Sequence, residues 1–341
     1  MTASWANADG GKKRLLVAHI LGQTGKDILA AREDVEVIEF ANTIGQDAFR
    51  ALLSAQPAVH GVILGSTAFG RAELTAAKSL QVVSRIGVGY DAVDVPAMSA
   101  AGIPVMIGTG ANCDTVAEHT LSSMLALAKR VHELDALVRM NRWHERYRYL
   151  PGEVRGSEVL IVGFGRIGSR VAQLCQAFGM RVRVYDPYVA HDALLAAGVD
   201  PVDDLDAALP SAEFVTLHCP KTSETIDLID AARLARFRHG AFLINTARGG
   251  IVDESALAER LTNGHLAGAA IDVFLPEPPV PGNPLLEMSN VICSPHLAGV
   301  TREAVERMAH LAVVNALSVF DGGPQLDNAV NRNAVATLAT V

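Results

Sequence analysis

Three side chains in the second half of the chain combine a cation, a carboxylate and an imidazole. Arg248 precedes a Gly-Gly pair, and its guanidinium can grip a carboxylate through two parallel hydrogen bonds. His296 follows Pro295 at the end of an apolar run, and an imidazole can exchange a proton with a ketone or alcohol oxygen near neutral pH. Glu277 stands between prolines that stiffen its loop, and it would orient the ring of His296 if the two are in contact. Taken singly, each of the three is an ordinary surface or structural residue, so a chemical role depends on the elements that position them.

The stretch 159–186 contains a strand, a glycine turn, a helix and a second strand in that order. The glycines fall at the spacing G-x-G-x-x-G and are Gly163, Gly165 and Gly168. In a dinucleotide site the first permits a tight turn, the second admits a pyrophosphate, and the third lets the helix pack on the strand. The free N–H groups at the helix start, around Arg166 and Ile167, suit an anion. The context therefore predicts a dinucleotide site.

Asp186 ends the second strand, about 20 residues after the glycines, where an acid is expected in such a site. Its carboxylate can accept hydrogen bonds from both ribose hydroxyls of an adenosine. It would repel a 2′-phosphate at the same place. We therefore expect the cofactor to be NAD rather than NADP.

Composition limits the class of protein. A chain of 341 residues, half of them hydrophobic, can bury two cores of ordinary size. A net charge of −8 argues against nucleic acid or an anionic membrane as a partner. No pattern of residues predicts a metal site. The cysteines lack any C-x-x-C spacing and are expected to be reduced thiols of a cytoplasmic protein: Cys113, Cys175, Cys219 and Cys293.

The first residues of the chain are not expected to be a signal peptide. Met1–Arg14 lacks the apolar core of a signal peptide, and residues 1–12 are expected to form a frayed tail. No apolar run approaches the length of a membrane span.

Strands and helices alternate through the chain in two blocks. The predicted strands are Arg14–Ile20, Val35–Phe40, Gly61–Gly65, Gln81–Ile86 and Pro104–Ile107 in the first block, and Phe214–His218, Ala241–Asn245, Gly268–Asp272 and Val291–Ser294 after the glycine stretch. The clearest helices are Gln46–Ala55, Arg71–Ser79, Ile167–Phe178, Ser255–Asn263 and Arg302–Phe320. This alternation predicts an α/β protein with two doubly wound parallel sheets. Polar residues follow the strands of the second block and should meet in one crevice, because the carboxyl ends of parallel strands converge.

Two further segments are predicted to be functional or exposed. Gly87-Val88-Gly89 follows the fourth strand, and its backbone N–H groups can face a ligand crevice, although an ordinary glycine turn fits the pattern too. Thr115–Val131 predicts one long helix that is apolar on more than one side, as between domains or subunits. On it, Glu118 and His119 fit a capping or buried polar role better than a catalytic one. Arg139–Gly152 predicts an exposed loop or arm.

Several motifs occur in a fixed order over about residues 14–333. They are Gly87-Val-Gly-Tyr-Asp91, Val116-Ala-Glu-His119, Gly163-Phe-Gly-Arg-Ile-Gly168, Asn245-Thr-Ala-Arg-Gly249, Ala269-Ala-Ile-Asp-Val-Phe-Leu-Pro-Glu277-Pro and Ser294-Pro-His-Leu-Ala-Gly299. Together they resemble the D-isomer-specific 2-hydroxyacid dehydrogenases, the family of the phosphoglycerate, D-lactate, glycerate and glyoxylate/hydroxypyruvate enzymes. The ordered set is far more specific than any single motif.

The resemblance implies a role for each residue. Arg248 would bind the substrate carboxylate, His296 would be the acid/base, and Glu277 would pair with His296. Backbone N–H groups of Val88 and Gly89 would complete the carboxylate site. The residues expected at the cofactor are the glycine turn with Arg166 and Ile167, together with Asp186, Cys219, Thr246 and Asp272, the last of which would hold the nicotinamide carboxamide.

The resemblance also implies the domain organisation. Residues 1–109 and 298–341 would form a flavodoxin-like substrate domain, and a Rossmann NAD-binding domain, residues 110–297, would be inserted into it. Hinges would lie near Gly108–Gly110 and Pro295–Gly299. The family dimerises through its cofactor domain, so a homodimer is expected. The implied activity is NAD-dependent interconversion of a small D-2-hydroxy acid and its 2-oxo acid.

The substrate is less well determined. Phosphoglycerate dehydrogenases usually carry an arginine just after the third strand, where this chain has Gly65-Ser66-Thr67, although Arg71 is close enough to substitute. The chain also ends without the regulatory domain of many of those enzymes. The enzyme 3-phosphoglycerate dehydrogenase is therefore the alternative. Trp143 lies where glyoxylate/hydroxypyruvate reductases place a tryptophan over a neighbour's pocket, which favours a small substrate; a surface tryptophan at a dimer contact fits equally well.

Two other functions fit parts of the pattern. Formate dehydrogenases share the fold but carry a glutamine where this chain has Glu277. An NADH-sensing corepressor would keep similar site residues, but the short tails and the lack of a basic extension argue against it. Turnover of NADH with a panel of 2-oxo acids separates an enzyme from such a sensor.

Overall fold

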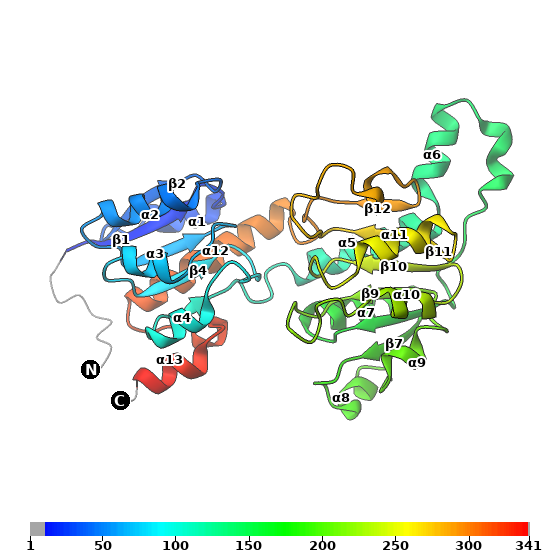
Figure 1. The fold of residues 1–341 in the computed structure, drawn as a ribbon. Coiled ribbons are helices and arrows are strands. Elements are labelled where there is room, and N and C mark those ends of the chain that lie inside the picture. The colour runs from blue at the N-terminus through cyan, green and yellow to red at the C-terminus, as the bar shows by residue number, and fades with distance from the viewer. Residues whose placement is uncertain (1–10, 340–341) are drawn as a thin grey trace. The chain divides into compact units, whose positions relative to one another are not determined.

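The computed structural model describes residues 11–339, which form two compact units, each built on a parallel sheet (Figure 1). Unit 1 comprises the residues up to Asn112 and from Thr301, and unit 2 comprises Cys113–Val300. The chain thus leaves unit 1 after its fifth strand and returns to it with the last helices. The predicted class, α/β with two doubly wound parallel sheets, is confirmed. Residues 1–10 of the predicted tail lie outside the described residues.

The sheet of unit 1 has the strand order β2-β1-β3-β4-β5, with every pair parallel. The strands are β1 (Lys13–Ala18), β2 (Val35–Phe40), β3 (Gly61–Leu64), β4 (Val82–Arg85) and β5 (Val105–Met106). This is the flavodoxin-like order that the resemblance implies. The helices are α1 (Gln23–Ala30), α2 (Gln46–Ala55), α3 (Arg71–Ala76), α4 (Val95–Ala100), α12 (Arg302–Phe320) and α13 (Arg332–Ala339), with a short 3₁₀ turn, η3 (Leu326–Asn328).

Helices cover both faces of this sheet, and the side chains of β1 contact both helix layers. Leu15 and Val17 point to the face packed by α1 and α12, whereas Leu16 and Ala18 point to the face packed by α2, α3 and α4. Successive side chains of a strand alternate between the two faces. A strand buried on both faces therefore needs the unbroken apolar run Leu15–Ala18 rather than an alternating one.

The segment after α12 packs back on unit 1 through Asn331. The Asn331 Oδ1 accepts a hydrogen bond from the N–H of Val105 at 2.9 Å, and its Nδ2 donates to the carbonyl of Ile103 at 2.9 Å and to the Ser99 hydroxyl at 3.2 Å. Asn331 is buried. One amide side chain thus provides hydrogen-bond partners for backbone groups at the edge strand β5 and holds the C-terminal segment against it.

The sheet of unit 2 has the strand order β12-β11-β10-β9-β6-β7-β8, again parallel throughout. The strands are β6 (Glu158–Val162), β7 (Arg181–Tyr185), β8 (Asp200–Pro201), β9 (Phe214–Leu217), β10 (Ala241–Asn245), β11 (Leu266–Ile271) and β12 (Val291–Cys293). Counted from β6, the first six strands have the 3-2-1-4-5-6 order of a Rossmann sheet. The order reverses between β6 and β9, where such sheets bind their ligands.

Helices cover both faces of this sheet. One face is packed by α5 (Cys113–Ala128), α7 (Arg166–Ala177) and α8 (His191–Ala196), and the other by α9 (Leu205–Ala208), α10 (Ala231–Arg236) and α11 (Glu254–Thr262). A 3₁₀ turn, η2 (Pro284–Glu287), lies before β12. Among the described residues, no helix is both long enough and apolar enough to cross a membrane.

The predicted long helix and the arm after it need correction. The helix predicted over Thr115–Val131 ends at Ala128, because Arg130 adopts a left-handed backbone with φ of 51°. A second helix, α6 (Val131–Arg139), follows at once, and a 3₁₀ helix, η1 (Trp143–Arg148), occupies the segment predicted to be a loop. We call 131–150 the arm; Figure 1 shows α6 extending away from the sheet of unit 2.

Replacing Asn331 by leucine tests the anchoring of the C-terminal segment. The change leaves the N–H of Val105 and the carbonyl of Ile103 buried without partners, so we expect the free energy of unfolding of unit 1 to fall by about 2–4 kcal/mol. Urea unfolding followed by circular dichroism measures it. Arg332→Ala, at the exposed neighbouring position, should cost less than about 0.5 kcal/mol. A near-native midpoint for Asn331→Leu would contradict the assignment.

Candidate active site

The glycine turn of unit 2 has the close backbone contacts expected of a dinucleotide site. Gly163 has φ of 96°, and a Cβ on it would lie 2.8 Å from the backbone N of Cys219. A Cβ on Gly168 would lie 2.0 Å from the carbonyl oxygen of Gly163, so only glycine lets α7 approach β6 this closely. Around Gly165 no atom lies within 4 Å of such a Cβ. The turn is therefore packed at its first and third glycines and open at the second.

The start of α7 and the acid after β7 complete this site. Gly165 is the N-cap of α7 and provides no side-chain hydrogen bond, so the N–H groups of Arg166 and Ile167 stay available to an anion. Asp186 accepts hydrogen bonds from the N–H of Phe164 at 2.7 Å and of Tyr188 at 2.9 Å. Its carboxylate is thereby fixed beside the glycine turn. These residues fit the pyrophosphate and ribose of a dinucleotide.

The edge of β9 next to the turn is uncharged. Burial raises the pKa of the Cys219 thiol to about 11 and lowers the pKa of His218 to about 3. The His218 ring lies 2.9 Å from the hydroxyl of Thr216. At neutral pH both groups are therefore neutral, so neither adds a charge beside the turn.

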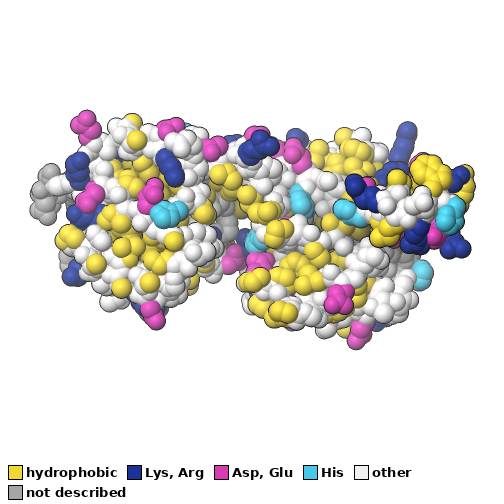
Figure 2. Space-filling model, turned by 90° about the horizontal axis from the view of Figure 1, so that it is seen from above, with side chains coloured by type: hydrophobic (Ala, Val, Ile, Leu, Met, Phe, Trp, Pro, Cys, Tyr) yellow, Lys and Arg dark blue, Asp and Glu magenta, His cyan; other side chains and the backbone are white. Residues whose placement is uncertain are grey.

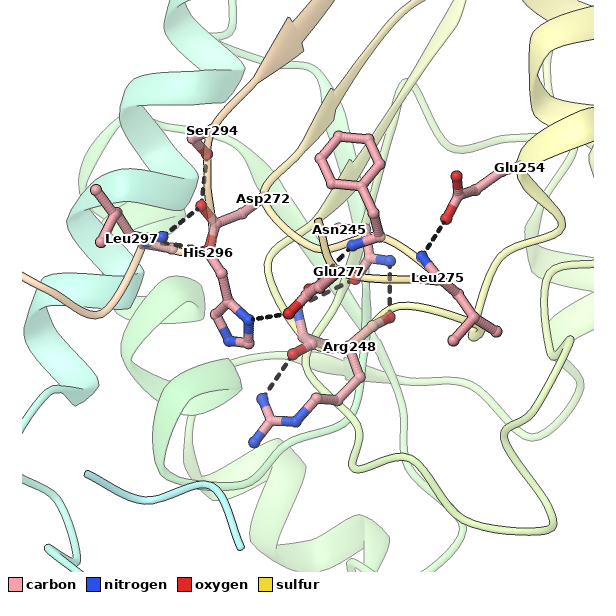
Figure 3. Close-up of polar contacts among 12 residues, drawn as sticks. Asn245, Arg248, Glu254, Asp272, Leu275, Glu277, Ser294, His296 and Leu297 are labelled. Carbon is pink, nitrogen blue, oxygen red and sulfur yellow. Dashed lines mark hydrogen bonds and ion pairs between the residues drawn. The ribbon is translucent and has the colours of Figure 1, made fainter. Parts of the chain in front are cut away.

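His296 and Glu277 are in contact. The imidazole Nδ1 of His296 lies 2.8 Å from a carboxylate oxygen of Glu277 (Figure 3). The other oxygen of Glu277 accepts the N–H of Phe274 at 3.0 Å, which fixes the carboxylate in its loop. The side chain of His296 is 49% exposed, so the ring can still meet a ligand with its other nitrogen.

Arg248 lies on a turn that Asn245 holds from both sides. Asn245 donates to the carbonyl of Arg248 at 3.0 Å and accepts from the N–H of Ala247 at 3.1 Å. A Cβ on Gly249 would lie 1.9 Å from the carbonyl oxygen of Phe274, so this turn touches the loop that carries Glu277. Figure 3 shows the guanidinium directed to the same side as the ring of His296. The three predicted chemical residues thus come together in unit 2.

Asp272 is buried and holds the backbone around His296. Its carbonyl accepts the N–H of His296 at 2.8 Å, while its carboxylate accepts the N–H of Leu297 and of Ala298, both at 2.9 Å. The hydroxyl of Ser294 donates to the same carboxylate at 2.5 Å. These hydrogen bonds fill three of the roughly four acceptor positions of the carboxylate, and its predicted contact with a nicotinamide carboxamide stays a prediction.

Two supporting residues were not predicted from the sequence. Glu254, in the first turn of α11, accepts the N–H of Leu275 and the amide of Asn283, both at 2.8 Å, and so holds the loop that carries Glu277. In unit 1, the guanidinium of Arg85 donates to the carbonyl of Gly89 at 2.9 Å. An acid in the first turn of a helix and an arginine at a strand end are too common to be singled out.

The loop with Val88 and Gly89 belongs to unit 1 and follows β4. Gly87, just before it, has φ of 117°, a backbone that glycine favours. Its predicted part in carboxylate binding stays a prediction. Among the described residues, no group of three or more histidines, cysteines and acids is placed to hold a metal ion.

Comparison with known proteins agrees with this geometry. Residues 121–298 match the family described as "D-isomer specific 2-hydroxyacid dehydrogenase, NAD binding domain". A D-3-phosphoglycerate dehydrogenase of Archaeoglobus fulgidus is 38% identical over 281 residues, which cover 82% of this chain and 53% of that protein. A glyoxylate reductase of Thermofilum pendens is 38% identical over 252 residues, which cover 73% of this chain and 74% of that protein.

Solved structures extend the likeness to nearly the whole chain. A D-lactate dehydrogenase of Aquifex aeolicus, solved with NAD and lactic acid, has a TM-score of 0.82 and 26% identity, and covers 93% of this chain and 99% of its own. The chain spans about half the length of the curated phosphoglycerate dehydrogenases it matches. From the family match and these identities, the chain belongs to the D-isomer-specific 2-hydroxyacid dehydrogenase family.

Proposed function

We propose that the protein is an NAD-dependent oxidoreductase that interconverts a small D-2-hydroxy acid and its 2-oxo acid. The observation that carries the proposal is the 2.8 Å contact between His296 and Glu277, in the same unit as the glycine turn and beside the turn of Arg248. A cation for a carboxylate, an acid/base for an alkoxide oxygen and a dinucleotide turn are the parts that such a reaction needs.

Each residue then has one task in the reduction. Arg248 binds the substrate carboxylate through its guanidinium and stabilises charge that develops on the carbonyl oxygen. His296 donates a proton to that oxygen from Nε2, while Glu277 holds Nδ1 and so fixes the orientation of the ring. When bound, the reduced nicotinamide supplies the hydride that adds to C2 of the 2-oxo acid. In the oxidation His296 takes the proton back.

Unit 1 is proposed to be the substrate domain and unit 2 the cofactor domain. In unit 1, the N–H groups of Val88 and Gly89 would bind the carboxylate, and Arg85 would hold their loop through the carbonyl of Gly89. In unit 2, Asp272 has one acceptor position left for the nicotinamide carboxamide. Cys219 and Thr246 follow the carboxyl ends of β9 and β10 and would line the same site.

The substrate is proposed to be a small 2-oxo acid such as glyoxylate or hydroxypyruvate. After β3, Asn42 accepts the N–H of Ser66 and donates to its hydroxyl, both at 3.0 Å, so neutral groups stand where a phosphate would need a cation. Several of the relatives are named D-3-phosphoglycerate dehydrogenase, and the exposed Arg71 lies in the first turn of α3. Phosphohydroxypyruvate is therefore the second candidate. Rates with glyoxylate, hydroxypyruvate, phosphohydroxypyruvate, pyruvate and phenylpyruvate decide between these substrates. A protein that only senses NADH would turn over none of them.

We propose a cytoplasmic location and a homodimer that forms through the arm. All four cysteines are free, which fits a reducing compartment. Large apolar side chains of the arm are exposed: Val131, Val138, Met140, Trp143, Tyr147 and Leu150. Figure 2 shows hydrophobic and basic side chains together at the end of unit 2 that carries the arm. A patch of this kind favours burial against a second copy.

Replacing His296 by alanine tests the acid/base assignment. We expect kcat for the 2-oxo acid to fall by about 10²–10⁴, since the proton donor is lost. The Kd for NADH, from fluorescence titration, should stay within about twofold because the glycine turn is untouched. His191→Ala is the matched control: that ring is also 49% exposed and lies 3.1 Å from a carboxylate of Asp203. Near-native turnover in His296→Ala would remove the assignment.

Asp186→Asn tests the choice of cofactor. Loss of the negative charge reduces repulsion of a 2′-phosphate, so the ratio of kcat/KM for NADPH to that for NADH should rise by about tenfold or more. Steady-state rates with both cofactors measure the ratio. Asp192→Asn, an exposed change in the first turn of α8, should leave it unchanged. An unchanged ratio in Asp186→Asn would show that this carboxylate does not select NAD.

A charge on the arm should break the proposed dimer. For the double change Val138→Glu and Trp143→Glu, sedimentation velocity should show a monomer where the unaltered protein shows a dimer, because two carboxylates would be buried without partners. Leu195→Glu, at an exposed apolar position on α8, is the control and should stay dimeric. A dimer that survives both changes would place the interface elsewhere.

A further inference from the structure

The backbone of His296 requires a support that the pairing with Glu277 does not provide. His296 has φ of 56°, the left-handed region that non-glycine residues seldom occupy. A residue keeps such a conformation only when its surroundings impose it. The three successive N–H groups of His296, Leu297 and Ala298 all donate to Asp272, which imposes the turn. The position of the imidazole therefore depends on what fixes Asp272.

Ser294 connects Asp272 to helix α5. The hydroxyl of Ser294 has one proton, and it donates this proton to the carboxylate of Asp272 at 2.5 Å. The Nε2 of His119 on α5 lies 3.3 Å from the same hydroxyl oxygen. Since Ser294 has no second proton to give, His119 is the donor in this contact. The order of donation is then His119 to Ser294 to Asp272.

The next residue of α5 contacts the turn of Arg248. The hydroxyl of Thr120 lies 3.0 Å from the hydroxyl of Thr246 and 2.8 Å from the carbonyl of Val116. The carbonyl can only accept, so Thr120 donates to it, and Thr246 donates to Thr120. Both threonines are buried. Thr246 stands two positions before Arg248.

Two adjacent residues of one helix thus contact the two loops that carry the chemical groups. We infer that His119 and Thr120 are positioning residues for the reaction: through Ser294 and Asp272, His119 fixes the loop of His296, and through Thr246, Thr120 fixes the turn of Arg248. The inference rests on the proposed function for its kinetic consequence but not for its structural one. The resemblance gave neither residue this task.

The first experiment changes His119. In His119→Leu the donor to Ser294 is lost, and we expect kcat to fall by about tenfold, the factor that corresponds to one partly buried hydrogen bond, with the Kd for NADH unchanged. His119→Gln keeps an N–H group near the place of Nε2 and should recover most of the rate. Should His119→Leu fail to fold, His119→Asn, whose amide is too short to reach Ser294, replaces it. Ser122→Ala, an exposed position of α5, is the control.

The second experiment changes Thr120. Thr120→Val has nearly the same shape but leaves the hydroxyl of Thr246 without its acceptor. We expect KM for the 2-oxo acid to rise by about tenfold with a smaller effect on kcat, because the turn of Arg248 loses its support. Thr120→Ser should behave like the unaltered enzyme. Equal effects of Thr120→Val and Thr120→Ser would overturn this half of the inference.

A measurement without cofactor or substrate separates positioning from other losses. Hydrogen exchange at the amides of Leu297 and Ala298 should accelerate by about tenfold in His119→Leu and stay near the wild-type rate in His119→Gln. Unchanged exchange in His119→Leu overturns the inference even if activity falls, since the loss then has another cause. If the unaltered protein turns over no 2-oxo acid, the proposed function fails, and the exchange rates still decide whether His119 fixes this loop.

Discussion

The buried carboxylate of Asp272 is the group on which the position of the His296 loop depends. The backbone carbonyl of Asp272 accepts the N–H of His296. Its carboxylate accepts the N–H groups of Leu297 and Ala298 and the hydroxyl of Ser294. Burying a carboxylate without enough hydrogen-bond donors costs free energy of folding. The turn supplies these donors, and the carboxylate supplies the acceptors that hold the turn. The turn holds the imidazole at the carboxyl edge of the sheet, and Glu277 then fixes its orientation. The position of the imidazole, and with it the proposed acid/base role of His296, therefore depends on a polar network and not on the ring alone.

Glycines set a second constraint, because they allow backbone to approach backbone. At Gly163 and Gly168 this approach builds the dinucleotide turn between β6, α7 and the end of β9. At Gly249 it places the turn of Arg248 against the carbonyl of Phe274, in the loop that carries Glu277. The cation and the acid/base pair are thus held in one corner by contacts that a single Cβ would prevent. The cofactor turn and this corner lie in the same unit, which belongs to a family of NAD-binding domains.

Much of the fold could be predicted from the sequence because two-sided burial forces unbroken apolar strands. The run at Ala241–Asn245 is buried almost throughout and has the predicted bounds, and the helix Arg302–Phe320 has its predicted bounds too. The edge strand Val35–Phe40 also has its predicted bounds, although Glu36 and Glu39 interrupt it and only Val35 and Phe40 are buried. The glycine turn and Asp186 were found because their spacing has a physical reason. The helix break at Arg130 was missed because no sequence pattern indicates that an arginine adopts a left-handed backbone conformation. Glu254 and Arg85 were missed because an acid in the first turn of a helix and an arginine at a strand end are common. His119 was named as a capping or buried polar residue, but its contact with Ser294 was not predicted because the two residues are 175 positions apart.

The most direct test of the account follows one hydrogen atom. NADH labelled with deuterium at C4 of the nicotinamide, on the face that is transferred, is incubated with the enzyme and hydroxypyruvate, and the product is analysed by mass spectrometry and chiral chromatography. We expect glycerate of the D configuration with the deuterium bonded to C2. A product without deuterium, or of the L configuration, would contradict direct hydride transfer in a site where Arg248 and His296 fix the orientation of the acid.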